Sequence, residues 1–166
     1  MQETTTDQSW FAKLAKLSIV LASISLVGVA AVEGWQVFAR YALNRSPSWT
    51  EPLALLFMST AVMCGAAVGV RTRRHFGFFM LSEHASPGTQ RTLKLFAAAI
   101  AAGIGVIFAL AGAKLVSDSW TFEVAGAPLP QGVVYLPVCL GGVLITIFAL
   151  EQFKNILRAA PGAPSE

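Results

Sequence analysis

Four long stretches without a charged residue divide the chain into apolar segments separated by polar ones. They run over residues 17–32, 52–70, 95–113 and 124–150. The second and third contain 19 residues each, and a helix of this length is about 28 Å long, close to the thickness of the hydrocarbon core of a bilayer. All four are rich in Ala, Leu, Val and Gly and lack the alternation of membrane strands. The pattern therefore predicts membrane-spanning helices.

The first and fourth stretches do not coincide with whole spans. The first becomes long enough when it continues through Glu33 to Ala39, which places Glu33 near one membrane face. The fourth begins with a proline-rich part, so we expect a loop that becomes helical near residues 131–133. The predicted fold is an all-α integral membrane protein that forms a single domain over residues 1–166. Its four spans are expected at about 14–39, 52–70, 95–116 and 132–152.

The basic residues predict how these spans are oriented. Nine of the twelve Lys and Arg residues lie in the two tails and in the loop at residues 71–94. The positive-inside rule places these segments in the cytoplasm. Both termini are therefore predicted to be cytoplasmic, and the loops at 40–51 and 114–132 to face the periplasm. The alternative for the first span is a secretory signal that begins with Lys13 and Lys16 and is removed by cleavage.

Composition excludes several classes of protein. Hydrophobic residues make up 55% of the chain and charged residues 13%, about half the charged share of soluble domains. We therefore exclude a soluble globule, a disordered chain and a nucleic-acid partner. Two cysteines in apolar stretches and two histidines are too few for an expected metal site. The uncharged centres of the spans argue against a transporter acting alone. The sequence offers no nucleophile–base pair, no His/Cys/Asp cluster and no phosphate loop, so neither an enzyme nor a cofactor is expected.

Charged residues approach the membrane at the first periplasmic loop. Glu33, Gln36 and Arg40 are three and four residues apart, so they share a helix face. We predict that Arg40 pairs with Glu51 or Glu33 and fixes the first span to the second. The alternative is an Arg40 side chain that extends into water.

The start of the second span carries its own signals. Thr50 is expected to cap the helix, with Pro52 near its first position. Glu51 would then lie in the first turn, where a negative charge suits the helix dipole. Trp49 flanks this turn.

The second span ends in a basic cluster. Arg71, Arg73 and Arg74 are interpreted as an anchor to anionic lipid headgroups, with His75 next to them as a weaker candidate for docking a partner. The apolar residues 76–81 could form a short helix lying in the membrane interface.

Small residues recur along the spans, at steps of four in the second and third, which places them on one helix face and predicts close helix packing; the alternative is that Ala and Gly are simply common there. They are Ala61, Gly65 and Gly69 in the second span, Ala97, Ala101, Gly105 and Ala109 in the third, and Gly141 and Gly142 in the fourth.

The first periplasmic loop resembles that of a known family. The sequence QVFARY at residues 36–41 is followed by Asn44 and by SWTE at residues 48–51. This segment, an Arg-Tyr pair followed about eight residues later by Trp-x-Glu, resembles the first-loop signature of the small membrane subunit of tripartite ATP-independent periplasmic (TRAP) transporters. The resemblance continues with Gly65-Ala66, Arg71, Arg74, His75-Phe76, Leu129-Pro130, Tyr135, Pro137 and Gly141. It covers about residues 14–153, and it departs from the family at Pro52, where many members carry a second glutamate.

The resemblance implies a multi-pass subunit of the bacterial inner membrane with two protein partners. The large membrane subunit of such a transporter binds sodium and substrate and moves by an elevator motion, and a periplasmic binding protein captures an organic acid. The small subunit would support the static scaffold of the large one and help dock the binding protein. Candidate structural or subunit contacts are Glu33, Gln36, Arg40, Trp49, Glu51, Arg71 and His75. Candidates for docking the binding protein are Arg45, Lys114, Asp118 and Glu123.

Two other functions are considered. A small four-helix exporter acting as a dimer would need a membrane-embedded carboxylate, for which Glu33 is the candidate. A structural subunit of another membrane complex is the second alternative.

Overall fold

The structure is a computed structural model that describes residues 3–45, 47–72 and 87–158. It contains the helices α1 (Glu3–Ala42), α2 (Thr50–Arg71), α4 (Pro87–Asp118) and α5 (Gly132–Arg158). Each helix includes one of the predicted ranges, and α5 begins where the proline-rich loop was expected to become helical. All four are long and apolar enough to cross a membrane. The prediction of an all-α protein with four long apolar helices is therefore confirmed.

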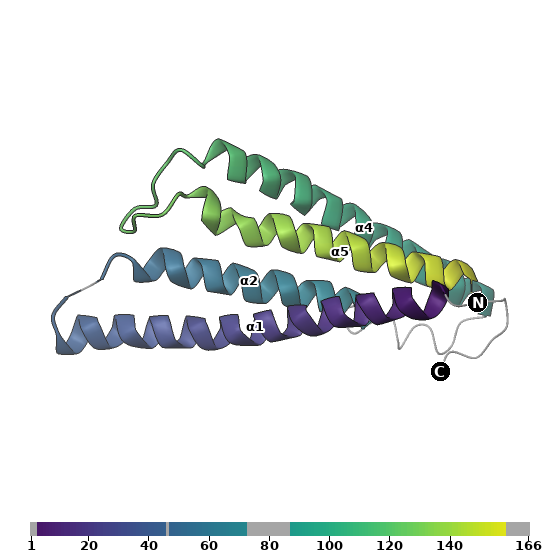
Figure 1. The fold of residues 1–166 in the computed structure, drawn as a ribbon, viewed down its shortest axis with the longest axis horizontal. Coiled ribbons are helices and arrows are strands. Elements are labelled where there is room, and N and C mark those ends of the chain that lie inside the picture. The colour runs from purple at the N-terminus through teal and green to yellow at the C-terminus, as the bar shows by residue number, and fades with distance from the viewer. Residues whose placement is uncertain (1–2, 46, 73–86, 159–166) are drawn as a thin grey trace.

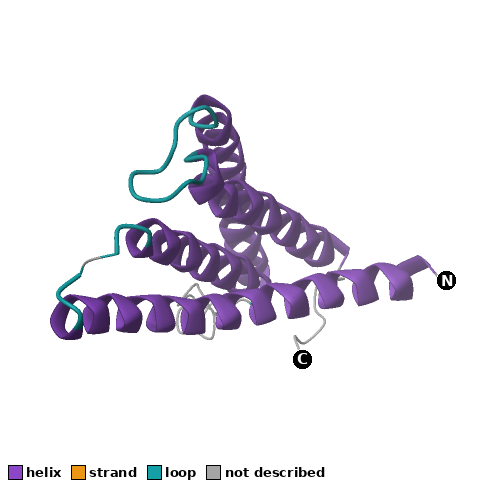
Figure 2. Ribbon diagram, turned by 60° about the vertical axis from the view of Figure 1, so that its left-hand side comes forward, coloured by secondary structure: helices purple, strands orange, loops and turns teal. Residues whose placement is uncertain are grey.

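The helices form two antiparallel hairpins, α1 with α2 and α4 with α5, which meet through contacts between α2 and α5 (Figure 1). The order across the bundle is α1, α2, α5, α4. The hairpins lie close together where α1 begins and α5 ends, which we call the tail end. They diverge toward the loops at residues 43–49 and 119–131, which we call the loop end (Figure 2).

α1 and α2 meet along a seam of mostly small side chains. Spacings of three, four and seven residues return to one helix face and are the pattern of a coiled pair. Gly28 of α1 lies against the ring of Phe57, which a Cβ would approach to 3.0 Å. Since α1 packs mainly on α2, we assign the seam to the buried residues that repeat with these spacings: Ala15, Ser18, Ser25, Val32 and Ala39 on α1 and Thr50, Ala54, Ala61, Cys64 and Val68 on α2.

α4 and α5 approach even more closely, through glycines. A Cβ on Gly105 would lie 2.8 Å from the backbone nitrogen of Thr146, and one on Gly112 would lie 2.6 Å from that of Cys139. A Cβ on Gly142 would overlap the backbone nitrogen of Ala109. Because backbone atoms cannot rotate away, these glycines set the distance between the two helices.

The two hairpins share a core toward the tail end. Met63, Ala67 and Val70 of α2 pack with Ile145 and with the fully buried Phe148 and Ala149 of α5; Ala15 of α1 and Ala101 of α4 complete this cluster. At Gly141 a Cβ would overlap the Met63 side chain. The adjacent glycines 141 and 142 thus serve different neighbours, α2 and α4.

Small residues at steps of four do not all lie at an interface. Ala101 and Gly105 of α4 are buried, in agreement with close packing. On α2, Ala61 and Gly69 are buried, but Gly65 is exposed and has no atom within 4 Å of a Cβ position. The predicted single face through residues 61, 65 and 69 is therefore wrong, because the buried residues of α2 follow spacings of three and four.

Candidate functional site

An ion pair joins α2 to α5 at the tail end. Arg71 Nε lies 3.2 Å from Glu151 Oε2, and the two side chains are 25% and 11% exposed. The Arg71 guanidinium also lies over the ring of Phe148, 5.9 Å from its centroid, within the range of a cation–π contact. This is the one ion pair found in the part of the chain that the structure describes.

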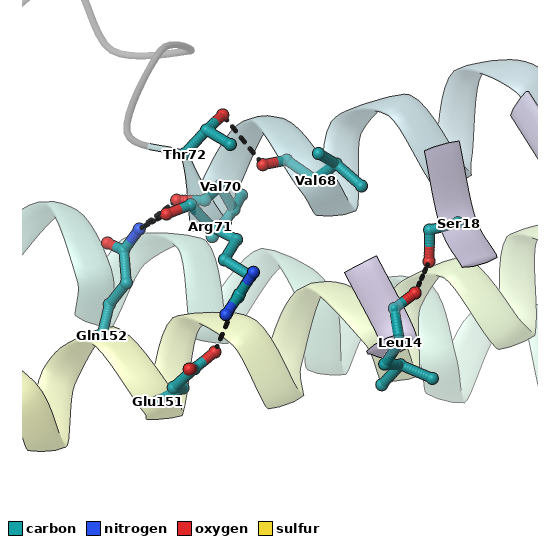
Figure 3. Close-up of polar contacts among 8 residues, drawn as sticks. All are labelled: Leu14, Ser18, Val68, Val70, Arg71, Thr72, Glu151 and Gln152. Atoms are coloured by element: carbon teal, nitrogen blue, oxygen red, sulfur yellow. Dashed lines mark hydrogen bonds and ion pairs between the residues drawn. The ribbon is translucent and has the colours of Figure 1, made fainter. Parts of the chain in front are cut away.

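Side chains of neighbouring helices cap α2 and α5 at the same end. The Gln152 amide donates to the carbonyl oxygens of Val70 and, at 3.0 Å, Arg71, as Figure 3 shows. These carbonyls belong to the last turn of α2, where the N–H partners of the helix interior are missing; the oxygen of Val70 also faces the N–H of Thr72, the residue that ends the helix. Arg91 of α4 similarly donates from Nη2 to the carbonyl oxygen of Leu157, at 3.1 Å. The tail end is thus joined by polar contacts as well as by the apolar core.

The loop after α1 ends that helix and starts α2. Asn44 adopts a φ of 49°, a left-handed conformation that Asn tolerates at helix ends. α2 begins at Thr50, and Trp49 at its N-cap makes no side-chain capping bond. The Thr50 hydroxyl instead donates to the carbonyl oxygen of Pro47, at 2.8 Å. The predicted Thr50 cap is therefore wrong, since the helix starts one residue earlier, whereas Glu51 does lie in the first turn.

The loop between α4 and α5 is folded on itself and attached to the first loop. The N–H of Val124 donates to the carbonyl oxygen of Leu129 at 2.9 Å, and that of Gln131 to Phe122 at 2.8 Å. Ser48 Oγ donates to the carbonyl oxygen of Gly126 at 3.1 Å. Gly126 has a φ of 90°, and a Cβ there would lie 2.5 Å from Ser48 Cβ. The contact spans the divergent loop ends of the two hairpins.

The charged residues predicted to link the first two spans are exposed. Within the described residues, Arg40 forms no ion pair with Glu51 or Glu33, so the predicted intrachain pairing does not occur. Glu33 lies two turns from Arg40, whereas ion pairs on one helix form three or four residues apart. Glu51 lies in the first turn of α2, where the helix dipole favours its charge. Their role as contacts to another subunit stays a prediction.

Two uncharged residues that were predicted as structural or subunit contacts lie near Arg40 and Glu51 along the chain. Gln36 is half-buried, and its Oε1 is buried without a hydrogen-bond partner among the residues that the structure describes. Trp49 is 43% exposed at the N-cap of α2.

All four candidates for docking the binding protein are exposed at the loop end. Arg45 follows α1, Glu123 lies in the folded loop, and Lys114 and Asp118 are four residues apart in the last turns of α4. Four residues is one helical turn, so the last two share a face. Their exposure leaves them accessible, and their docking role stays a prediction.

Several predictions fall outside the described residues. They concern His75, Arg73, Arg74 and the proposed interfacial helix at 76–81. Over the ranges that are described, no group of three or more His, Cys, Asp or Glu side chains is placed to hold a metal ion.

The roles of Glu151 and Gln152 and the contact between Ser48 and Gly126 were not predicted from the sequence. A signal existed for Glu151, because it ends the fourth uncharged stretch as Arg71 ends the second. Spans two and four run in the same direction, so these opposite charges reach the same end of the bundle. No comparable signal existed for Ser48, whose partner is a backbone oxygen 78 residues away.

Comparison with known proteins identifies similar membrane components. Residues 29–159 match the family described as the DctQ component of tripartite ATP-independent periplasmic transporters. The chain is also 24% identical over 141 residues to the sialic acid TRAP transporter small permease protein SiaQ of Vibrio cholerae serotype O1. That match covers 84% of this chain and 81% of the relative. The family match includes α2, α4, α5, both loops of the loop end and the part of α1 from residue 29 onward.

Proposed function

The chain belongs to the DctQ component family of TRAP transporters, and on that premise we propose that it is the supporting membrane subunit of such a transporter. It is a small permease component and not an enzyme, and a tripartite system implies a large membrane subunit and a periplasmic binding protein as partners. In the proposed role, this chain packs against the static scaffold of the large subunit, which couples sodium to uptake of an organic acid. Its loop end helps dock the binding protein.

The distribution of charge carries this proposal. The middle of each helix is uncharged, and small residues bring the helix backbones together. A coupled solute site usually requires midplane carboxylates or interrupted helices, whereas α1, α2, α4 and α5 are continuous. A rigid bundle of this kind suits a fixed support for a moving partner.

The basic residues of the described helices support an orientation with the tail end in the cytoplasm. Seven of them lie in the tail-end half of their helices: Lys13, Lys16, Arg71, Arg91, Lys94, Lys154 and Arg158. In the bacterial inner membrane, the loop end would then face the periplasm. This places Arg45, Lys114, Asp118 and Glu123 on the side from which a binding protein arrives.

Reconstitution tests the proposed role. Proteoliposomes would hold this chain, the large subunit or both, with the binding protein outside and an inward sodium gradient. The substrate is a labelled organic acid that this binding protein retains; sialic acid is tried first, because the name of the V. cholerae relative contains it. We expect uptake only when both membrane subunits are present. Uptake or export by this chain alone would favour the small exporter, and full uptake without it would contradict a supporting role.

A further inference from the structure

The α1–α2 hairpin has two sides, and the rest of the bundle covers one of them. Leu14 of α1 and Ala67 of α2 pack in the core that contains Phe148 of α5. Each directly precedes a seam residue. In an antiparallel pair built on a seven-residue repeat, residues at equivalent positions beside the seam lie on the same side of it in both helices. Leu14 and Ala67 occupy such equivalent positions, and both face α5. The positions that flank the seam on its other side therefore point away from α5.

These positions form two exposed rows, which together we call the open side of the hairpin. Both rows repeat every seven residues, as a continuous strip along a coiled pair requires. All of these residues are exposed, Leu26 at 63% and Met58 at 58%. The open side consists of Leu26, Glu33 and Arg40 on α1 and Glu51, Met58 and Gly65 on α2.

Charge distinguishes the open side from a surface that faces lipid alone. Glu33, Arg40 and Glu51 gather at its loop-end part, and none of them has an ion-pair partner within the described residues. Glu33 lies nine residues before the end of α1, which is about 14 Å of helix rise. Glu33 also lies inside the predicted first span, where a charged side chain is costly in contact with hydrocarbon. The two carboxylates and one guanidinium leave this part with an excess negative charge, which a basic side chain of a partner would complement.

Gly65 provides space on the same side. Apart from the backbone of α2 itself, no atom of the described residues lies within 4 Å of a Cβ position there, in contrast to Gly141 and Gly142, which are covered by α2 and α4. Small residues on a membrane helix allow the backbone of another helix to approach closely. Gly65 follows Met58 by seven residues, so a single helix lying along the open side can meet both the glycine and the charged part.

We propose that the open side is the surface on which the large membrane subunit of the transporter docks. Its docking helix runs along the hairpin, passes close to Gly65 and carries a basic side chain beside Glu33 and Glu51. This inference rests on the proposed supporting role and assigns that role to one face of the bundle.

The test measures how much large subunit co-purifies with the tagged full-length chain in a mild detergent. Gly65→Leu fills the open space on α2, and Gly103→Leu is its matched control, because Gly103 of α4 is also exposed with nothing within 4 Å of a Cβ. We expect Gly65→Leu to reduce recovery roughly tenfold, the effect of about 1.4 kcal/mol at the interface, and Gly103→Leu to leave it unchanged. Thermal unfolding of each purified variant reports whether the chain itself still folds.

Charge substitutions test the same face without adding bulk to it. Glu33→Lys is expected to reduce recovery of the large subunit more than Glu33→Gln does, since only the lysine repels a basic partner. Unchanged recovery with both Gly65→Leu and Glu33→Lys would mean that lipid covers the open side and would overturn the proposal. Loss with Gly103→Leu alone would place docking on the other hairpin and also overturn it. Failure of the unaltered chain to recover any large subunit would instead contradict the proposed function.

Discussion

Glu151 of α5 lies 3.2 Å from Arg71 at the end of α2, and this pair joins the two helices through which the hairpins meet. Arg71 lies over the ring of the buried Phe148, which precedes Glu151 by three residues on α5, and Gln152 follows Glu151 with its amide on the last carbonyl groups of α2. One turn of α5 therefore neutralises the charge at the end of α2 and caps its backbone.

Removing the charge of Glu151 should weaken the junction between the hairpins. Glu151→Gln leaves Arg71 partly buried without a counter-ion, and we expect a loss of about 1 kcal/mol in the free energy of unfolding, near the upper range for exposed pairs. The measurement is thermal unfolding in detergent, followed by circular dichroism. Lys154→Gln, an exposed change on the same helix, is the control. Exchanging the two charges in Arg71→Glu/Glu151→Arg should recover part of the loss, and equal melting of Glu151→Gln and Lys154→Gln would contradict the assignment.

Gln152 is expected to matter as a hydrogen-bond donor. Gln152→Met keeps the length of the side chain but removes the amide donor from the carbonyl oxygens of Val70 and Arg71, at an expected cost of about 1–2 kcal/mol. Hydrogen exchange of the amides in the last turn of α2 should then increase, while exchange in the first turn stays unchanged. If the substitution left the exchange rate of the last turn of α2 unchanged, Gln152 would have no capping role.

The existence and approximate extent of the helices could be predicted from the sequence, because the thickness of a bilayer fixes how long an uncharged stretch must be. The start of α5 at Gly132 followed from the prolines before it, and the position of Glu51 in the first turn of α2 followed from turn chemistry. These features depend on residues that are close together along the chain.

Contacts between helices could not be predicted in the same way. A spacing of four residues defines a helix face but does not identify the neighbour that covers it, so Gly65 and Gly69 of α2 have opposite environments. Arg40 had two glutamates within sequence reach and pairs with neither in the described residues, whereas Arg71 pairs with a residue 80 positions away. Such choices depend on how the hairpins are placed against one another.

Gly142 should tolerate no side chain. A methyl group there overlaps the backbone of α4 at Ala109, so Gly142→Ala is expected to push α4 from α5 and to cost about 1–3 kcal/mol, the usual range for overpacking. Gly103→Ala is the matched control and should be neutral or stabilising by up to about 1 kcal/mol, because Ala is the better helix former. The difference in melting temperature between the two variants in detergent is the measurement. A Gly142→Ala protein as stable as Gly103→Ala would contradict the close approach.

The contact between the two loops should depend on Gly126 more than on Ser48. Gly126→Ala combines an unfavourable positive φ with overlap on Ser48, and strain of this kind costs about 1–3 kcal/mol. Ser48→Ala loses one exposed hydrogen bond and should cost less, about 0.5–1 kcal/mol. Limited proteolysis of the loop at 119–131 measures the effect, with faster cleavage expected in Gly126→Ala. Equal cleavage rates in Gly126→Ala and the unaltered chain would show that the loop keeps its fold without this contact.

The orientation of the bundle can be tested with two cysteines at opposite ends. Ser117→Cys lies near the loop end and Asn155→Cys near the tail end, and both original side chains are exposed and uncharged. The background carries Cys64→Ala and Cys139→Ala, so that only the introduced thiol reacts. With basic residues concentrated at the tail end, the positive-inside rule predicts that a membrane-impermeant maleimide labels Ser117→Cys in spheroplasts and labels Asn155→Cys only after lysis. The reverse pattern would invert the orientation, and it would also move Arg45, Lys114, Asp118 and Glu123 to the side that a periplasmic binding protein cannot reach.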